Sequence, residues 1–262
     1  MTETRFSGQT AIITGGESGI GRSTAVLMAE WGAKVYLTDI RQLPENTARY
    51  QELGISRSTG DVREEAVLQQ LVDRAVAETG RLDLLVNNAG VGMVKPVTEV
   101  TEEDWDFCMG VNLKGAFFGC KHAIRQMLKG DGGSIVNVAS NAGLLPRAHD
   151  PLYSTSKQAV VGMTKSLALC HAKDRIRINA VCPGPVGETG MMDADIEKAD
   201  DSDQFIHDVI HASPGAAAWN RMITPEEVAE SIAWLCSDAA LMVTGTMLAI
   251  DGGKSLGVPP AS

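Results

Sequence analysis

Short apolar runs alternate with longer stretches in which apolar residues recur at helical spacing along the 262-residue chain. The short runs predict β-strands, because they are apolar nearly throughout and turn residues bound them. These runs are Thr10–Thr14, Lys34–Asp39, Ile55–Thr59, Leu82–Asn87, Ser134–Ser140, Arg177–Cys182 and Thr246–Ile250. The longer stretches predict helices at Ile20–Trp31, Glu64–Glu78, Glu102–Leu128, Ser154–His171 and Pro225–Leu235.

This alternation predicts an α/β fold. Strands that are apolar on both faces need cover on both faces, and right-handed crossovers through helices then give a doubly wound parallel sheet. No linker, repeat or low-complexity segment divides the chain, so we expect one domain over residues 1–262. The exception to the rhythm is a segment at about 187–221, acidic at its start and rich in Ala and Met. A connection this long usually forms a lid or binding loop, so we expect a substrate lid there.

Composition narrows the classes of function. A net charge of −10 argues against a nucleic-acid surface, although a helix N-terminus can still hold an anionic ligand. The start of the chain is polar and no apolar run approaches the roughly 18 residues of a membrane span, which argues against a signal peptide and a membrane protein. The five cysteines form no C-x-x-C pair, and we expect them to be reduced thiols in apolar surroundings. We therefore expect a soluble cytoplasmic protein.

A glycine-rich turn joins the first predicted strand to the first helix. It reads Thr14-Gly15-Gly16-Glu17-Ser18-Gly19-Ile20-Gly21. Glycine lets a backbone turn sharply against a pyrophosphate, and the amides of the following helix then face the phosphates. The spacing differs from the strict G-x-G-x-x-G pattern, but the strand before it and the helix after it supply the required context. The alternative is a glycine-rich turn without a ligand.

The end of the second predicted strand bears on the choice of dinucleotide. Asp39 stands there, and a carboxylate at that position accepts hydrogen bonds from ribose hydroxyls and repels a 2′-phosphate. Glu17 adds negative charge nearby, whereas Arg41 could swing toward a 2′-phosphate. We expect NAD rather than NADP. An ordinary turn aspartate is the alternative.

Polar residues also end the next two strands. Asp61-Val62 follows the third and Asn87-Asn88-Ala89-Gly90 the fourth. Ligands of open α/β sheets bind beyond the carboxyl ends of strands, which makes these residues candidates for ligand contacts. Turn chemistry explains Asn and Gly equally well.

A tyrosine and a lysine four residues apart provide candidate chemistry. Tyr153 and Lys157 share one face of a predicted helix. An adjacent ammonium and a positive nicotinamide favour the phenolate, so we expect Lys157 to lower the tyrosine pKa and Tyr153 to take a proton from an alcohol. Ser140, at the end of the fifth strand, could hydrogen-bond the substrate oxygen. Asn112 lies within a predicted helix and marks either a local break that holds water or a solvated side chain.

Taken together, these motifs resemble the short, single-domain branch of the short-chain dehydrogenase/reductase family over nearly the full chain. The matching pieces are Thr14–Gly21, Asp61, Asn87–Gly90, Asn112, Ser140, Tyr153-x-x-x-Lys157, Asn179, Pro183-Gly184 and Asp251-Gly252-Gly253. The resemblance implies a Rossmann-type, seven-stranded parallel sheet flanked by helices. It also implies a homotetramer in which helices 102–128 and 154–171 pack across one interface.

The resemblance also implies residue roles. Tyr153 is the expected acid/base, Lys157 binds the nicotinamide ribose, Ser140 positions the substrate oxygen and Asn112 holds a relay water. Positions that match cofactor contacts are Gly15, Ser18, Gly19, Ile20, Gly21, Asp39, Asp61, Val62, Asn88, Ala89, Gly90, Tyr153, Lys157, Pro183, Gly184 and Val186.

One departure from the family pattern affects the nicotinamide end. The usual Pro-Gly-x-x-x-Thr has Glu188 in the threonine position, with Thr189 one residue later. Either Gly187 lets the loop bulge so that Thr189 contacts the carboxamide, or that contact is lost.

The expected function is NAD-dependent hydride transfer between a nicotinamide and a secondary alcohol, diol or ketone. The alternatives are an NADPH-dependent carbonyl reductase of the 3-oxoacyl type and a non-catalytic nucleotide-binding protein of the same fold. We expect no metal, since the helical pair His207 and His211 lacks a third ligand. Trp105 and the pair Phe117-Phe118 occupy apolar helix positions and are expected in the core.

Overall fold

A computed structural model describes residues 5–257. In this part of the chain seven parallel strands form one sheet in the order β3-β2-β1-β4-β5-β6-β7. The strands are β1 Thr10–Thr14, β2 Lys34–Asp39, β3 Ser56–Thr59, β4 Leu84–Asn87, β5 Gly133–Val138, β6 Ile176–Pro183 and β7 Met247–Ile250. All seven predicted strands are confirmed, with ends that differ by at most two residues. The predicted doubly wound sheet is also confirmed.

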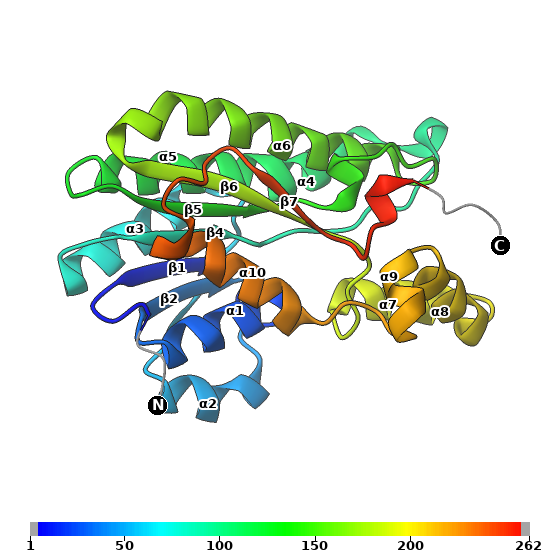
Figure 1. Cartoon of the computed structure of the whole chain (residues 1–262), viewed down its shortest axis with the longest axis horizontal. Coiled ribbons are helices and arrows are strands. Elements are labelled where there is room, and N and C mark those ends of the chain that lie inside the picture. Colours follow the sequence, from blue (N-terminus) through cyan, green and yellow to red (C-terminus); the bar gives the residue numbers. More distant parts are fainter. Residues whose placement is uncertain (1–4, 258–262) are drawn as a thin grey trace.

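Helices cover both faces of the sheet (Figure 1). Helices α1 (Gly19–Glu30) and α10 (Pro225–Cys236) pack together on one face, and α3 (Glu65–Thr79), α5 (Ala116–Met127) and α6 (Pro151–His171) cover the other. The short helix α2 (Thr47–Glu52) lies between β2 and β3.

Alternate residues of β1 belong to different apolar cores. Ile13 is buried in the cluster that includes residues of α1 and α10, and Ile12 in the cluster on the opposite face. Side chains along a strand point to opposite faces, so a strand covered on both faces must be apolar at every position. This is the physical reason why the short apolar runs identified the strands.

The predicted helix over 102–128 is interrupted. Helix α4 (Glu102–Met109) and α5 are separated by a π-helical turn at Gly110–Gly115, which contains Asn112. Two glycines bound this turn, and the buried Asn112 side chain bonds outside its own helix. The prediction of one continuous helix was therefore wrong, whereas the local break inferred from Asn112 is confirmed.

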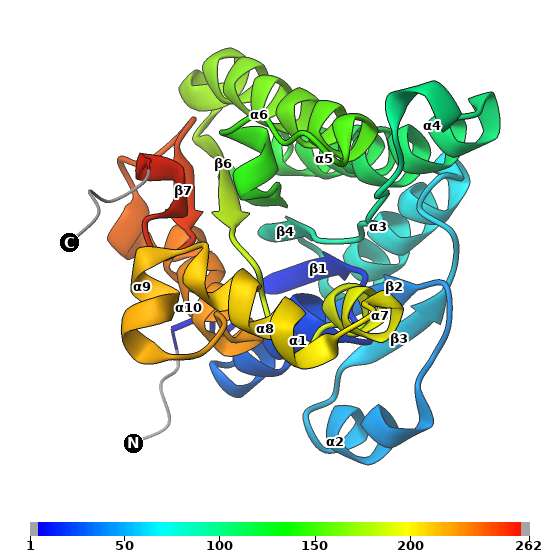
Figure 2. The same cartoon turned by 90° about the vertical axis from the view of Figure 1, so that its right-hand side faces the viewer.

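Three short helices form within the segment expected to be a lid. They are α7 (Gly190–Lys198), α8 (Ser202–His211) and α9 (Pro214–Trp219), and they follow the carboxyl end of β6 (Figures 1 and 2). Helix α7 packs closely on the loop after β4, since a Cβ at Gly92 would lie 3.3 Å from Cγ of Met191. Just beyond this segment, Thr224 forms a capping box with Glu227 at the start of α10.

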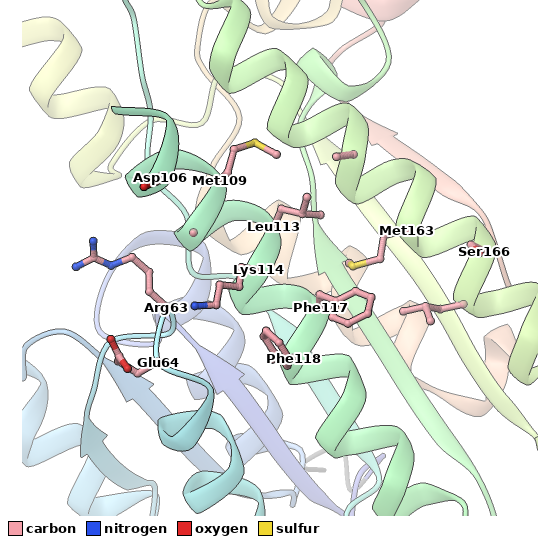
Figure 3. A pocket seen from close by; sticks show the side chains of 13 residues that line it. Arg63, Glu64, Asp106, Met109, Leu113, Lys114, Phe117, Phe118, Met163 and Ser166 are labelled. Carbon is pink, nitrogen blue, oxygen red and sulfur yellow. The ribbon is translucent and has the colours of Figure 1, made fainter. Parts of the chain in front are cut away.

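Two expectations about buried residues were wrong. Trp105 and Phe117, both expected in the core, are 47% and 48% exposed. Phe117 instead lines a groove of about 940 Å³ beside α6, together with Leu113, Phe118 and Met163 (Figure 3).

Four cysteines are buried, but Cys170 is exposed. No helix among residues 5–257 is long and apolar enough to cross a membrane.

Candidate active site

The glycine-rich turn has a backbone that only glycine accommodates. Gly15 has a φ of +66°, and a Cβ on it would lie 2.8 Å from Cα of Ala89. A Cβ on Gly21 would lie only 2.0 Å from the carbonyl oxygen of Gly15. Ser18 precedes α1 as its N-cap but makes no side-chain capping bond, which leaves the first amides of α1 available for an anionic ligand. These features fit a dinucleotide pyrophosphate.

The loop after β4 supports this turn. Asn88 Nδ2 donates to the carbonyl oxygens of Thr14 and Gly15 at 3.1 and 2.8 Å. The backbone amides of Asn88 and Ala89 both donate to the Thr14 hydroxyl at 3.1 Å. The structure thus brings together candidates from the glycine-rich turn and from the loop after β4. Asn88 stabilises the turn through its hydrogen bonds.

Asp39 lies at the end of β2, half-buried beside the same turn. Its Oδ2 accepts a hydrogen bond from the backbone N–H of Glu17 at 3.1 Å. The Glu17 carboxylate, which we expected to add negative charge near Asp39, is buried. It is 1% exposed and pairs with Arg57 through two contacts of 2.7 Å. Sequence patterns did not identify Arg57, because it lies 40 residues away on β3.

The residues after β3 occupy the neighbouring strand end. Asp61 forms an ion pair with Arg63 at 2.7 Å. Hydrogen bonds from Arg63 outweigh the effect of partial burial and lower the pKa of Asp61. Val62 is buried against the π-helical turn, since a Cβ on Gly115 would lie 3.0 Å from its Cγ2.

Ser140, Tyr153 and Lys157 gather at the carboxyl end of β5. All three are buried, with exposed fractions of 6%, 8% and 3%. The Ser140 hydroxyl lowers the pKa of Tyr153, and Lys157 Nζ lies 5.7 Å from the centre of the tyrosine ring. The ammonium also donates to the carbonyl oxygen of Val138 at 2.9 Å. Tyr153 and Lys157, one helical turn apart on α6, therefore lie beside Ser140 after β5, as expected for residues that act together.

Burial shifts the pKa of both Tyr153 and Lys157. Burial raises the pKa of Tyr153, and the groups that counteract it are the Ser140 hydroxyl and the Arg147 guanidinium rather than Lys157. Burial also lowers the pKa of Lys157 to about 8. Burial thus disfavours the charged form of each of these two side chains.

The side chain of Asn112 is held firmly in the π-helical turn. Its Oδ1 accepts from the backbone N–H of Val91 at 2.8 Å, and its Nδ2 donates to Val91 O and to Ser156 Oγ, both at 3.0 Å. Ser156 was not a candidate from sequence, although its place beside Lys157 on α6 was a usable signal. Ser156 connects Asn112 to the helix that carries Tyr153 and Lys157.

The loop after β6 brings Thr189 to the glycine-rich turn. Val186 bridges to Ile223, and Glu188 has a φ of +53°, so the chain bulges before α7. A Cβ on Gly19 would lie 3.0 Å from Cγ2 of Thr189, so this threonine packs against the glycine-rich turn. The Thr189 hydroxyl donates to Val186 O and caps α7 through Met192 N. Pro183 and Gly184 lie at the end of β6, with Gly184 against Asp251.

The pair His207 and His211 forms no metal centre with other side chains. The two rings stack at 3.9 Å, and within residues 5–257 no group of three or more His, Cys, Asp or Glu residues could hold a metal ion.

Known proteins resemble this chain in sequence and in fold. A family model described as enoyl-(acyl carrier protein) reductase matches residues 15–255. An uncharacterized oxidoreductase of Thermotoga maritima is 39% identical over 95% of this chain and 98% of its own. A cis-4-hydroxycyclohexanecarboxylate dehydrogenase of Sinomonas cyclohexanicum is 38% identical over 95% and 97%. The crystal structure of levodione reductase superposes with a TM-score of 0.89 at 30% identity, covering 97% of this chain and all of that one.

The chain belongs to the short-chain dehydrogenase/reductase family. It is an oxidoreductase that acts on alcohols or ketones with a nicotinamide cofactor.

Proposed function

We propose that this protein is an NAD-dependent dehydrogenase of secondary alcohols or diols, or of the corresponding ketones. The observation that carries the proposal is the buried convergence of Ser140, Tyr153 and Lys157 beside a glycine-rich turn built for a pyrophosphate. The substrate is a small molecule, and neither nucleic acid nor membrane is required.

In the proposed mechanism, Ser140 and Tyr153 hold the substrate oxygen by hydrogen bonds. In the oxidation direction, Tyr153 accepts the hydroxyl proton of the substrate, and a nicotinamide held in the site would supply the acceptor for the hydride of the same carbon. Lys157 holds the nicotinamide ribose, and its ammonium stabilises the phenolate once the site is occupied. Asn112 keeps the π-helical turn in place, so that a proton can leave Lys157 through a held water.

Asp39 supports the choice of NAD. Its carboxylate lies beside the glycine-rich turn, where it can accept bonds from two ribose hydroxyls but would repel a 2′-phosphate. Cofactor contacts are proposed for the turn residues, for Asp61 and Val62, for Asn88–Gly90 and for Pro183, Gly184 and Val186. Thr189 is proposed to contact the carboxamide end, with the bulge at Glu188 compensating for its shifted position.

The segment 187–221 is proposed to cover the substrate. Its first helix already contacts both the glycine-rich turn, through Thr189, and the loop after β4, through Met191. A cover anchored at these two points would exclude water from the reacting carbon.

Assembly into a homotetramer is proposed from two separate exposed apolar faces. One is the groove of Figure 3, which Phe117 lines, and the other includes Leu241 and Met242 near β7, which are 63% and 93% exposed. Two distinct faces, each paired with its own copy, generate a tetramer with dihedral symmetry.

The test is a panel of cyclic and linear secondary alcohols and diols, assayed with NAD and with NADP by NADH or NADPH absorbance. NAD-linked turnover is expected, with a loss of about a hundredfold or more in Tyr153→Phe. Tyr36 is a buried tyrosine on β2 whose hydroxyl donates to Glu78. The variant Tyr36→Phe is therefore the matched control and should retain activity. Turnover that survives Tyr153→Phe would refute the mechanism. A preference for NADPH and ketones would favour a carbonyl reductase, and NADH binding without turnover would favour a binding protein.

A further inference from the structure

A buried ion pair lies beneath the glycine-rich turn. Glu17, within the turn, is 1% exposed, and Arg57 on β3 has a side chain that is 12% exposed. The pair is bidentate, because Arg57 Nε and Nη2 each donate to one carboxylate oxygen at 2.7 Å. Such a fork-to-fork arrangement uses the guanidinium edge that would otherwise suit a phosphate.

Further bonds complete the pair. Glu17 Oε2 also accepts from Leu43 N and from Asn46 Nδ2, both at 3.0 Å. Arg57 donates its remaining bonds to Leu43 O and the Thr47 hydroxyl. Burial would raise the pKa of Glu17, but the bonds from Arg57, Asn46 and Leu43 outweigh it and lower that pKa. The carboxylate is therefore charged at neutral pH and cancels the charge of Arg57.

This pair lies next to the ribose-binding carboxylate. Arg57 is opposite Leu37 in the β2–β3 register, two residues before Asp39, and the backbone N–H of Glu17 donates to Asp39 Oδ2. The guanidinium therefore comes from a residue two pairs along the β2–β3 register from Asp39, the residue beside which a dinucleotide 2′-substituent is recognised.

The space outside the turn is also acidic. A cavity of about 250 Å³ lies there, and Arg22 is the basic residue in its lining. Arg22 is itself engaged, since its Nε donates to Asn46 Oδ1 at 2.8 Å. The acidic residues that line the cavity are Glu17, Glu45, Glu188 and Glu226.

We propose that Glu17 is a second specificity-determining residue for the dinucleotide, acting through Arg57. Because Glu17 is paired with the Arg57 guanidinium, that guanidinium is not available to bind a 2′-phosphate. Asp39 repels that phosphate, and Glu17 removes the compensating attraction. This inference rests on the proposed function, because it presumes that a dinucleotide ribose lies beside Asp39.

A purely structural role for Glu17 predicts a different outcome from a charge role. A glutamine at this position retains an oxygen that can accept from Leu43 N and Asn46, but it leaves Arg57 without its counter-charge. If packing alone matters, Glu17→Gln changes the binding of every adenine nucleotide alike. If the charge matters, only ligands with a 2′-phosphate bind better.

The experiment measures calorimetric binding of adenosine 2′,5′-bisphosphate and of AMP to the full-length protein. Neither probe carries a nicotinamide, so the result does not depend on alcohol turnover. Relative to AMP, Glu17→Gln is expected to bind the bisphosphate about tenfold more tightly than wild type does. The double variant Glu17→Gln/Arg57→Met is expected to return to the wild-type ratio. Glu78→Gln, which removes a surface ion pair with Arg74, should leave the ratio unchanged.

Equal weakening of both probes in Glu17→Gln would overturn the inference, and so would a gain that persists in the double variant. If Glu17→Gln does not fold, Arg57→Met alone is decisive, since it leaves an uncompensated carboxylate and should shift the ratio against the bisphosphate. An unchanged or opposite shift would then refute the proposal. Wild-type protein that binds neither probe would instead count against the proposed dinucleotide function itself.

Discussion

Ser156 Oγ lies 3.0 Å from Nδ2 of Asn112 and donates its own proton to the carbonyl oxygen of Tyr153 at 2.7 Å. This hydroxyl thus joins the π-helical turn to the first turns of α6. We predict that Ser156→Ala lowers kcat about tenfold, because Asn112 loses a buried partner worth about 1–3 kcal/mol. KM and NADH affinity should change little, as expected for a positioning residue. Thr155→Ala, which removes an exposed hydroxyl from the same helix, is the control. Equal losses in both variants would contradict this role.

Asp39→Ala should shift cofactor preference toward NADP. Removal of the carboxylate eliminates both the acceptor for the ribose hydroxyls and the repulsion of a 2′-phosphate, and bonds to a charged group are worth about 1.5–3 kcal/mol. We expect the NADPH-to-NADH ratio of kcat/KM to rise about tenfold or more. Asp73→Ala, at an exposed aspartate of α3, is the control. An unchanged ratio would mean that Asp39 does not set the preference.

Cofactor binding should weaken above neutral pH through Lys157. Burial lowers the pKa of this residue to about 8, so its ammonium is charged below that pH and is lost as the pH rises through it. If the ammonium holds the nicotinamide ribose, NADH affinity is highest below about pH 8 and falls above it. Fluorescence titration of NADH across this range measures the effect. Lys157→Met should bind weakly without this pH dependence, whereas Lys165→Met, on the same helix, should behave as wild type.

The start of α10 should confer acid-sensitive stability. Arg221 and the backbone N–H of Thr224 lower the pKa of Glu227 from 4.5 to about 2. A lowered folded-state pKa contributes stability that is present above about pH 4.5 and is lost as the pH falls toward 2. Both side chains are over a third exposed, so we expect Glu227→Gln to cost less than about 1 kcal/mol at neutral pH. Urea unfolding should show that this difference shrinks with acidification, and a constant difference would contradict it. Glu230→Gln is the control.

The two exposed apolar faces should act independently in assembly. A charge in the groove of Figure 3, as in Phe117→Glu, should convert tetramers to dimers in sedimentation velocity. Met242→Glu should do the same through the other face, and the double variant should be monomeric. Variants that remain tetrameric would show that these faces are not the interfaces.

The sequence by itself determined the order and type of most elements and the core of the candidate site. Parallel strands with cover on both faces are apolar at nearly every position, as in the fully buried β1 and β4, and this pattern is visible without knowledge of their neighbours. The four-residue spacing of Tyr153 and Lys157, and Ser140 at a strand end, were also local features. Their convergence follows from topology, because the carboxyl ends of parallel strands share one edge of the sheet.

Tertiary structure decided what depends on partners distant in sequence. The helical period marks an apolar face but not whether that face meets the sheet or remains exposed, so Trp105 and Phe117 were misplaced. The pKa of Tyr153 depends on burial, which no spacing reveals. Likewise, the sequence shows Glu17 only as a charge in a turn, because its partner Arg57 comes from another strand and reaches it only in the folded chain. Burial and long-range pairing set the energy of a charged group, and both exist only once the chain has folded.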